Sequence, residues 1–520
     1  MRVSLARSAL VISALYLLSN VVGFFARLLI NARFGAGAEQ DAFRAAFVIP
    51  DLLFNVFAGG ALVSAFIPVY VARLTHDQAR FAWRLAQATA LVVVGAVAVL
   101  SVIAALLAPW LIRTLVARAF DPAQAMLAAA LMRVMLVATV IFSASGLLMG
   151  VLQSNQHFFA PALAPSLYQF GMILGATVLS EVGIFGLAWG VVVGAGLHLG
   201  VQLPIAVQLW RHLPRGGSGV ATRAVWSDLR QVLRLMPPRM IGLGAVQVNQ
   251  LVNTTLASAV LGGVSAFNNA FAILLLPIAA IGQAAGTALF PALSAHAARG
   301  EHALLAQALT RALGAVVLLS LPGAVGLIVL GEPLIRLLFE RGAFDARATH
   351  WVAFALAWLA LGLPAHVGLE LVTRAFYALK DSTTPALIAV LSVILNVALS
   401  AVLFGWFAEM GVPAIGGLGL ANALATTAEV VALYALLARR LPALSLRPLG
   451  VALVKSGVAS VAMSALLLLW RASVGEAALP TLAALVIGGV AYGSVLLLVR
   501  SEEARSVVNK ARHLLQQRAG

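Results

Sequence analysis

Three charged residues at the start of a long apolar stretch are the first side chains here that could do chemistry. Asp41, Arg44 and Asp51 lie in GAGAEQDAFRAAFVIPD, residues 35–51, although only 10% of the chain is charged. A charge at the centre of a bilayer costs about 2.5–3.5 kcal/mol on insertion scales, so such residues usually face a cavity or a partner. Arginine is suited to bidentate contacts with phosphate. The trio predicts either a polar cavity or a structural pair between Asp51 and a nearby arginine.

Other polar residues share helical faces with this trio or with one another. Positions four or seven apart lie on one side of a helix, so Asn55 shares a face with Arg44 and Asp51. By the same spacing Asn20 and Arg27 share a face, and Arg239 begins a polar stripe on a later helix. The predicted binding residues are therefore Asn20, Arg27, Arg44, Asp51, Asn55 and Arg239. The alternative is that the arginines near helix ends reach lipid headgroups instead.

The remaining intramembrane polarity has simpler explanations. Glu370 and Arg374 are spaced i, i+4, which predicts a structural ion pair. Asparagines and threonines on the later helices can serve as hydrogen-bond partners between helices. Arg133 and Glu429 are intramembrane charges to which the sequence assigns no partner.

The elements that carry these residues are transmembrane helices. The chain has 520 residues, 62% of them apolar, and a mean hydropathy of +1.01. Apolar stretches long enough to cross about 30 Å of hydrocarbon recur from end to end, and β-barrel strands would be shorter and alternating. The sequence thus predicts an all-α polytopic membrane protein with about 14 transmembrane helices. The stretches lie near 9–31, 42–72, 81–109, 123–153, 158–180, 184–208, 229–258, 263–294, 304–331, 350–378, 384–404, 412–438, 449–470 and 478–499.

The positive charges indicate an orientation rather than a nucleic-acid partner. With the N-terminus inside, alternate segments hold 19 Lys and Arg on the inner side and 7 on the outer side. This asymmetry follows the positive-inside rule and predicts that both termini are cytoplasmic. The chain has no cysteine, which excludes disulfides and thiolate metal sites. It also has neither a P-loop nor an H-E-x-x-H motif, so we expect no enzyme, metal or cofactor.

An internal repeat divides the chain into two halves. AFRAAF (42–47) matches AFNNAF (266–271) at an offset of 224, and GVLQSNQHFFAPAL (150–163) matches RAFYALKDSTTPAL (374–387) at the same offset. The repeat predicts two pseudo-symmetric six-helix lobes, an architecture of transporters with the site between the repeats. The predicted domains are an N-lobe at 1–208, a cytoplasmic linker at 209–228, a C-lobe at 229–440, and two further helices with a basic tail at 441–520.

Five motifs together resemble one family. They are FGAGAEQDAF (34–43), AFIPVY (65–70), GTALFPALS (286–294), FERGAFD (339–345) and AFYALKDSTTPA (375–386). As a set they are similar to the MurJ/MviN family of lipid II flippases, within the superfamily of multidrug and oligosaccharidyl-lipid exporters. The resemblance covers the whole chain.

The resemblance implies a carrier in the bacterial inner membrane. Such a carrier moves undecaprenyl-pyrophosphate-linked muropeptide, lipid II, from the inner to the outer leaflet by alternating access. It implies a cationic cavity for the headgroup, an ion gradient or membrane potential as the driving force, and peptidoglycan-synthesis proteins as further partners. In the FGAG segment, Gly35, Gly37 and the following Asp41 are the implied gating residues, with Asp41 at the outer rim.

The chain departs from the family where arginines are usual. The corresponding positions are Asn20, Ala26, Phe54 and Ala272, none of them basic. Arg27 is next to Ala26, but one residue is a 100° rotation on a helix. Three alternatives to a lipid II flippase therefore stay open: an exporter of another lipid-linked oligosaccharide, an exporter of an amphipathic drug, or a transport-dead cell-wall scaffold.

Overall fold

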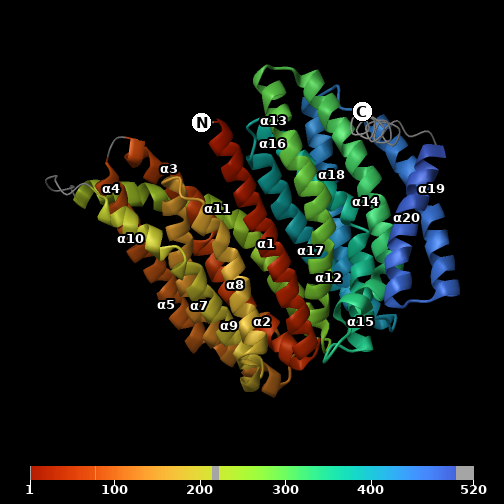
Figure 1. Ribbon diagram of the computed structural model, residues 1–520, viewed down its shortest axis with the longest axis horizontal. Helices are drawn as coiled ribbons and strands as arrows, with labels where there is room; N and C mark the ends of the chain where they lie inside the picture. Colours follow the sequence, from red (N-terminus) through yellow and green to blue (C-terminus); the bar gives the residue numbers. More distant parts are fainter. Residues whose placement is uncertain (1, 76–77, 214–221, 499–520) are drawn as a thin grey trace. The chain divides into compact units, whose positions relative to one another are not determined.

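The computed structural model describes residues 2–75, 78–213 and 222–498, and these are helical with short connections and no strand (Figure 1). The prediction of an all-α polytopic protein is confirmed. The basic tail after residue 498 and residues 214–221 of the predicted linker lie outside this description. The α-helices are α1 (Arg2–Phe34), α2 (Ala38–Leu53), α3 (Gly60–Thr75), α4 (Ala79–Thr89), α5 (Gly95–Leu106), α6 (Ala108–Leu111), α7 (Pro122–Ser154), α8 (Phe159–Thr177), α9 (Ile184–Gly200), α10 (Leu203–Arg211), α11 (Thr222–Ala257), α12 (Gly263–Pro277), α13 (Ala284–Ala298), α14 (His302–Phe339), α15 (Ala346–Ala360), α16 (Leu363–Ala378), α17 (Thr383–Glu409), α18 (Ile415–Arg440), α19 (Leu446–Val474) and α20 (Ala478–Leu498).

The described residues contain fewer candidate membrane spans than the fourteen that the sequence predicts. Within the described ranges, eleven helices are long and apolar enough to cross a membrane, or twelve if α15 and α16, bent by 47° to each other, form one span. The predicted segments 158–180 and 229–258 are helical, as α8 and α11, but neither is among these spans. The reason is polarity: α8 carries Tyr168 and Gln169, and the uncharged half of α11 carries Gln247, Asn249, Gln250 and Asn253. The count of fourteen spans is not confirmed.

The chain divides into two compact units. The first comprises Met1–Ser265 with Arg341–Phe344, and the second comprises Ala266–Glu340 with Asp345–Gly520. The long helix α11 packs against α3 and α4 and so belongs to the first unit. The lobe boundaries expected from the repeat remain a prediction.

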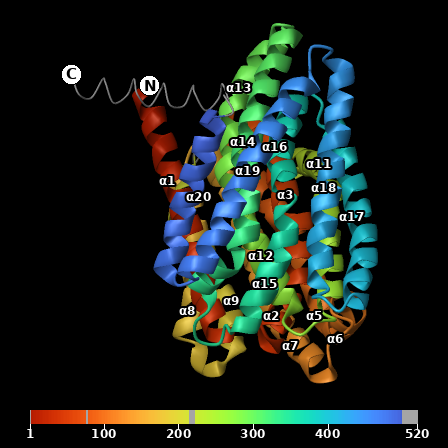
Figure 2. The ribbon, with the colours of Figure 1, turned by 90° about the vertical axis from the view of Figure 1, so that its right-hand side faces the viewer.

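Each unit is built around its own packed helices. In the first, α8 packs on α1 and α9, and α7 packs on α2 and α9 around a core of mainly alanine and leucine. In the second, α17 packs along α18 and α19 along α20, as Figure 2 shows, and α14 contacts both α15 and α19. Small side chains suit this packing, because helices in a membrane associate through close van der Waals contact.

The repeat is visible in the backbone. In the first repeat, helix α2 passes into a π-helical turn, η1 (Phe54–Ala58), and then into α3. In the second, α12 passes into the π-helical turn η5 (Ile278–Gln283) and then into α13. Phe54 and Ile278 are separated by 224 residues, the offset of the sequence repeat. Such π turns are rare in proteins, and those that occur are often found at functional sites.

The corners between α7 and α8 and between α16 and α17 also correspond. Gln156 and Lys380, again 224 apart, are the two non-glycine residues with positive φ in the described ranges, each at 62°. At the first corner His157 N donates to Leu152 O at 2.9 Å, and at the second Asp381 N donates to Phe376 O at 2.9 Å. Both are Schellman-type helix ends.

The expected structural ion pair is present, and the two unassigned charges have partners. Arg374 Nη1 lies 2.5 Å from Glu370 Oε2, which confirms that prediction. Arg133 Nε donates to the carbonyl of Ala105 at 2.9 Å. Glu429 is hydrogen-bonded to the Ser392 side chain.

Candidate functional site

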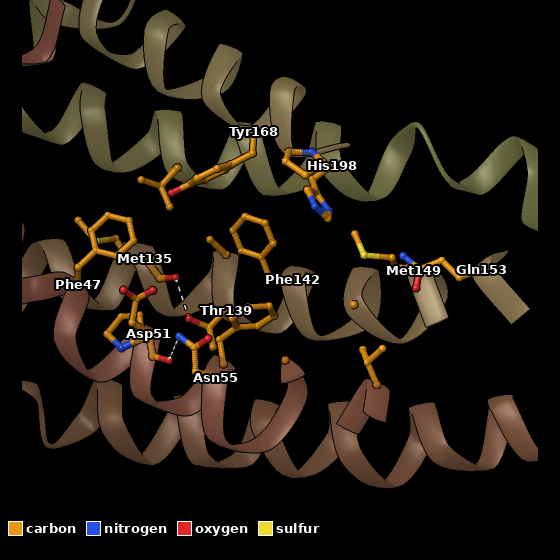
Figure 3. Close-up of a pocket in the computed structure, with 18 residues that line it drawn as sticks. Phe47, Asp51, Asn55, Met135, Thr139, Phe142, Met149, Gln153, Tyr168 and His198 are labelled. Carbon is orange, nitrogen blue, oxygen red and sulfur yellow. Dashed lines mark hydrogen bonds between the residues drawn. The ribbon is translucent and has the colours of Figure 1, made fainter. Parts of the chain in front are cut away.

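A cavity of about 510 Å³ lies inside the first unit (Figure 3). Its walls come from α2, η1, α3, α7, α8 and α9, and most of the lining is apolar or aromatic. The polar side chains that face it are Asp51, Asn55, Thr139, Gln153, Tyr168 and His198. A mainly apolar cavity with a few placed polar groups is the usual form of a ligand site.

The junction of α2 and η1 places the acidic group. Asn55 Nδ2 donates to the backbone carbonyl of Asp51 at 2.9 Å. The side-chain amide thus provides a hydrogen bond to a backbone carbonyl where the α-helix changes to the π turn. The half-buried carboxylate of Asp51 forms no ion pair shorter than 4.0 Å with a residue that the structure describes. It is therefore available to a ligand in the cavity.

Two arginines lie behind this acidic wall. Arg44 precedes Asp51 by two turns on α2 and is attracted electrostatically by both Asp51 and Asp41. Arg27 on α1 is close enough to Arg44 for the two guanidiniums to repel each other. The Arg44 Nε is buried and has no hydrogen-bond partner among the described residues. Positive charge is thus concentrated beside the cavity, although neither arginine forms part of its lining.

An aromatic cluster forms the opposite wall. The ring of Phe142 on α7 lies 5.6 Å from Phe54, 5.0 Å from Tyr168 and 5.3 Å from His198, measured between centroids. These edge-to-face and tilted contacts are the favoured geometries for aromatic pairs. They hold the rings of three helices and of the π turn together.

His198 is fixed by a buried polar chain. Gln202 Nε2 donates to Ser145 Oγ at 2.7 Å, and Ser145 Oγ lies 2.6 Å from His198 Nδ1. If the serine hydroxyl donates in that contact, Nδ1 is the acceptor and the other ring nitrogen carries the proton. His198 can then offer an N–H to an oxygen in the cavity.

The predicted gating residues lie in a separate, tightly packed junction. The carboxylate of Asp41 is fully buried and accepts hydrogen bonds from Gly262 N at 2.7 Å, Ser265 N at 2.7 Å and Ser265 Oγ at 2.6 Å. It thereby caps the first turn of α12, where a negative charge is favourable. Ser265 follows Asp41 by 224 residues, so the bond joins equivalent positions of the two repeats.

Gly35 completes this junction. It has a φ of +65°, and a Cβ atom there would overlap the carbonyl of Ala343. Ala343 N in turn donates to Ala32 O at 2.8 Å, which docks the segment Arg341–Phe344 onto the end of α1. The FGAG and FERGAFD motifs therefore meet in the structure.

The other predicted residues are not gathered at the cavity. Asn20 is exposed, and Gly37 is the half-buried N-cap residue of α2. Arg239 is half-buried on α11, and its Nη1 has no hydrogen-bond partner among the described residues. The structure thus brings Asp51 and Asn55 into the cavity wall, places Arg27 and Arg44 nearby, and separates the rest from it.

Sequence reasoning missed Phe142, Tyr168 and His198 as cavity residues. All three belong to helices in which polar and aromatic residues follow no periodic pattern, so the sequence held no signal for them. Phe54 is different, because the family resemblance marks it as a position where an arginine is usual. The structure places Phe54 in the cavity lining.

The fold is similar to that of solved membrane transporters. A solved structure of the lipid II flippase MurJ, in an inward closed conformation, matches with a TM-score of 0.78 and 23% identity over 96% of this chain and 100% of that chain. An inward-facing multidrug resistance MATE family transporter of the MOP superfamily matches with a TM-score of 0.66 and 17% identity over 83% of this chain and 94% of that chain. At these identities the likeness establishes the fold.

Sequence comparison establishes the family. A family model described as lipid II flippase MurJ matches residues 30–487. The lipid II flippase MurJ of Burkholderia cenocepacia is 34% identical over 424 residues, which cover 80% of this chain and 80% of the relative. The chain belongs to the MurJ family of lipid II flippases, and the expected family is confirmed. This family consists of transporters rather than enzymes.

Proposed function

We propose that the chain flips lipid II from the inner to the outer leaflet of the bacterial cytoplasmic membrane by alternating access. The observation that carries this proposal is the family match, which extends over residues 30–487 rather than over one motif. The multi-pass helical fold and the cavity in the first unit support it further. Lipid II is the lipid-linked precursor from which peptidoglycan is assembled.

The proposed membrane arrangement has two six-helix lobes and two further helices, fourteen in all, with both termini in the cytoplasm. The π turns beginning at Phe54 and Ile278 and the corners at Gln156 and Lys380 support the repeat, since both pairs differ by 224 positions. The excess of Lys and Arg on alternate connections supports the orientation.

The proposed binding site combines the cavity wall with the positive charge behind it. Asp51 and Asn55 face the cavity, and Arg27 and Arg44 attract the pyrophosphate of the headgroup. Asn20 and Arg239 remain proposed contacts for the substrate along its path. The proposed gate consists of Gly35, Gly37 and Asp41. The tight packing around Gly35 and the hydrogen bonds of Asp41 would have to be rearranged before the cavity could open on this side of the membrane.

The transport cycle is proposed to use an ion gradient or the membrane potential. The sequence has no P-loop for ATP. A protonatable acid beside an arginine in a cavity is a suitable place for such coupling, because its charge state changes the field that the headgroup meets.

One observation also suits an amphipathic drug as cargo. The lining itself holds one acid, Asp51, among aromatic side chains, and a lipophilic cation could stack there. The family match favours lipid II. The two cargoes are distinguished by competition: an excess of a lipophilic cation should leave lipid II flipping unchanged if lipid II is the cargo.

The arginines give a direct test of the binding proposal. We expect the variant R27Q/R44Q/R239Q to lose lipid II flipping when it is the only flippase in a cell, at normal expression and membrane insertion. The matched control R113Q/R118Q/R347Q removes three exposed arginines elsewhere and should keep activity. Full activity of the first variant would show that these arginines do not bind the headgroup.

A further inference from the structure

The start of α11 carries a basic surface that the proposed transport site does not use. Arg223, Arg230 and Arg234 are spaced by seven and four residues, which places them on one side of the helix. All three are exposed and line a groove of about 760 Å³. The opposite side packs into the hydrophobic cluster through Leu229 and Val232. We call the three arginines the α11 basic face.

Among the residues that the structure describes, no acidic side chain is paired with this face. Asp228 is the only acid in the sequence between Glu181 and Glu301. It is engaged by Arg73 at the end of α3, with Nε to Oδ2 at 2.5 Å and Nη2 to Oδ1 at 2.8 Å. None of the three arginines of the basic face forms an ion pair with a residue that the structure describes. The charge is therefore available to an anion from outside the protein.

The pairing of Asp228 with Arg73 also indicates where the basic face lies relative to the membrane. The candidate span Ala38–Thr75 ends two residues after Arg73, so the first turns of α11 lie where that span leaves the hydrocarbon. Figure 1 shows α11 beside α3 and α4. Trp226, 54% exposed, lies between the arginines in the same groove, and tryptophan is enriched at the level of the headgroups.

We propose that the α11 basic face binds the phosphates of anionic phospholipid headgroups in the adjoining leaflet. Clusters of arginine next to a membrane span attract anionic lipid, and an arginine fork suits phosphate. The face extends over about 16 Å of helix, which suits several neighbouring headgroups better than the single pyrophosphate of one lipid II molecule. The tryptophan anchors the same turns at the interface. This inference is independent of the transport proposal.

Lipid selectivity of the full-length protein tests the proposal without any transport. The protein is reconstituted in phosphatidylcholine bilayers with spin-labelled phosphatidylglycerol or, separately, spin-labelled phosphatidylcholine as the probe. Electron paramagnetic resonance then gives the relative association of each probe with the protein. We expect the native protein to prefer phosphatidylglycerol, and R223Q/R230Q/R234Q to lose that preference several-fold. The control R113Q/R118Q/R347Q, with the same loss of charge, should keep it.

Two results would overturn the proposal. One is an equal preference in the native protein and the basic-face variant, including no preference in either. The other is a basic-face variant that keeps the native preference for phosphatidylglycerol but binds lipid II more weakly in phosphatidylcholine bilayers, while the control variant binds it normally. That result would assign the face to the transported lipid. High salt should weaken the native preference, because screening reduces attraction between exposed charges.

Discussion

Two aspartates on one helix have different environments. Asp41 is fully buried and its carboxylate accepts three hydrogen bonds from the segment Gly262–Ser265. Asp51, ten residues later, faces a cavity, and its carboxylate forms no ion pair with a described residue. The first environment favours a structural or gating contact, and the second places a negative charge where it acts on a ligand in the cavity. The sequence alone could not separate these roles, because both residues are acids in the same apolar stretch.

Removing the Asp41 contacts should destabilise the protein in proportion to the bonds lost. We expect Asp41→Asn to lower the free energy of unfolding by about 3 kcal/mol, because hydrogen bonds to a charged acceptor are worth about 1.5–3 kcal/mol each. In addition, the amide N–H group of the asparagine would face a backbone N–H group that now donates to the carboxylate. Ser265→Ala removes only the hydroxyl bond to this carboxylate and should cost about 1.5 kcal/mol. Detergent-induced unfolding followed by circular dichroism measures both. Equal stability of Asp41→Asn and the native protein would contradict the assignment.

Neutralising Asp51 should slow transport without weakening binding. In Asp51→Asn the charge of Arg44 is no longer balanced, so the pyrophosphate should bind more tightly and leave more slowly. We expect the flipping rate to fall by about tenfold, which corresponds to about 1.4 kcal/mol, while the apparent affinity for lipid II rises. Glu39→Gln, exposed on the same helix, should change neither quantity. A variant with weaker binding and an unchanged maximal rate would place Asp51 in headgroup recognition instead.

The cavity residues were only partly predictable. Asp51 and Asn55 were found because charge and amide groups are rare in apolar stretches and recur at helical spacing. Tyr168 and His198 were not, since their approach to Phe142 depends on how α7, α8 and α9 pack. Asn20 and Arg239 followed the same spacing rule, yet the structure leaves them outside the cavity lining. Helical spacing shows which residues share one face of a helix, but it does not show which other helix or cavity that face contacts.

At the scale of elements, breaks in the helices were harder to predict than the helices themselves. The apolar stretches gave the helical segments, because hydrocarbon thickness sets a minimum length. The stretch 42–72 is interrupted by the π turn at Phe54–Ala58, and the stretch 81–109 by another π turn at Ala90–Val94. A π turn depends on one extra residue in a helical turn, which composition does not show. Counting apolar stretches likewise included α8 and α11, which are not among the candidate spans of the described residues.

The two equivalent corners allow a paired stability test. Gln156 and Lys380 adopt a left-handed conformation that glycine adopts with little strain, whereas other L-residues pay about 1–2 kcal/mol. We therefore expect Gln156→Gly and Lys380→Gly each to stabilise the protein by about 1 kcal/mol, offset in part by the entropy of glycine in the unfolded chain. Gln153→Gly, inside helix α7, should instead destabilise it by about 1 kcal/mol. Destabilisation at both corners would contradict the helix-end assignment.

The close packing of α8 and α9 depends on glycines. Gly175 and Gly190 face each other so closely that a Cβ at Gly190 would lie 2.7 Å from the Gly175 Cα. We expect Gly190→Ala to separate the helices and to cost about 1–3 kcal/mol. Gly196→Ala is the matched control on the same helix, because a Cβ there has no neighbour within 4 Å. Thermal unfolding in detergent compares the two, and equal melting temperatures would show that the contact is not tight.

At the scale of the whole molecule, the repeat is the feature that sequence and structure share most fully. An offset of 224 residues relates sequence motifs, π turns, helix corners and the Asp41–Ser265 pair. The family match extends over most of the chain, yet the positions where the family resemblance implies an arginine hold Asn20, Ala26, Phe54 and Ala272. We propose that other charges, including Arg27 and Arg44 beside the cavity, attract the anionic headgroup in this chain.

The most direct measurement is complementation of a bacterium depleted of its own lipid II flippase. The chain is expressed at normal levels, its membrane insertion is verified, and lipid II exposed on the outer leaflet is quantified. We predict restored growth together with restored exposure, which would show that this chain flips lipid II without arginines at positions 20, 26, 54 and 272. Continued accumulation of lipid II on the inner leaflet, with the protein correctly inserted, would contradict the assignment of this chain as a lipid II flippase.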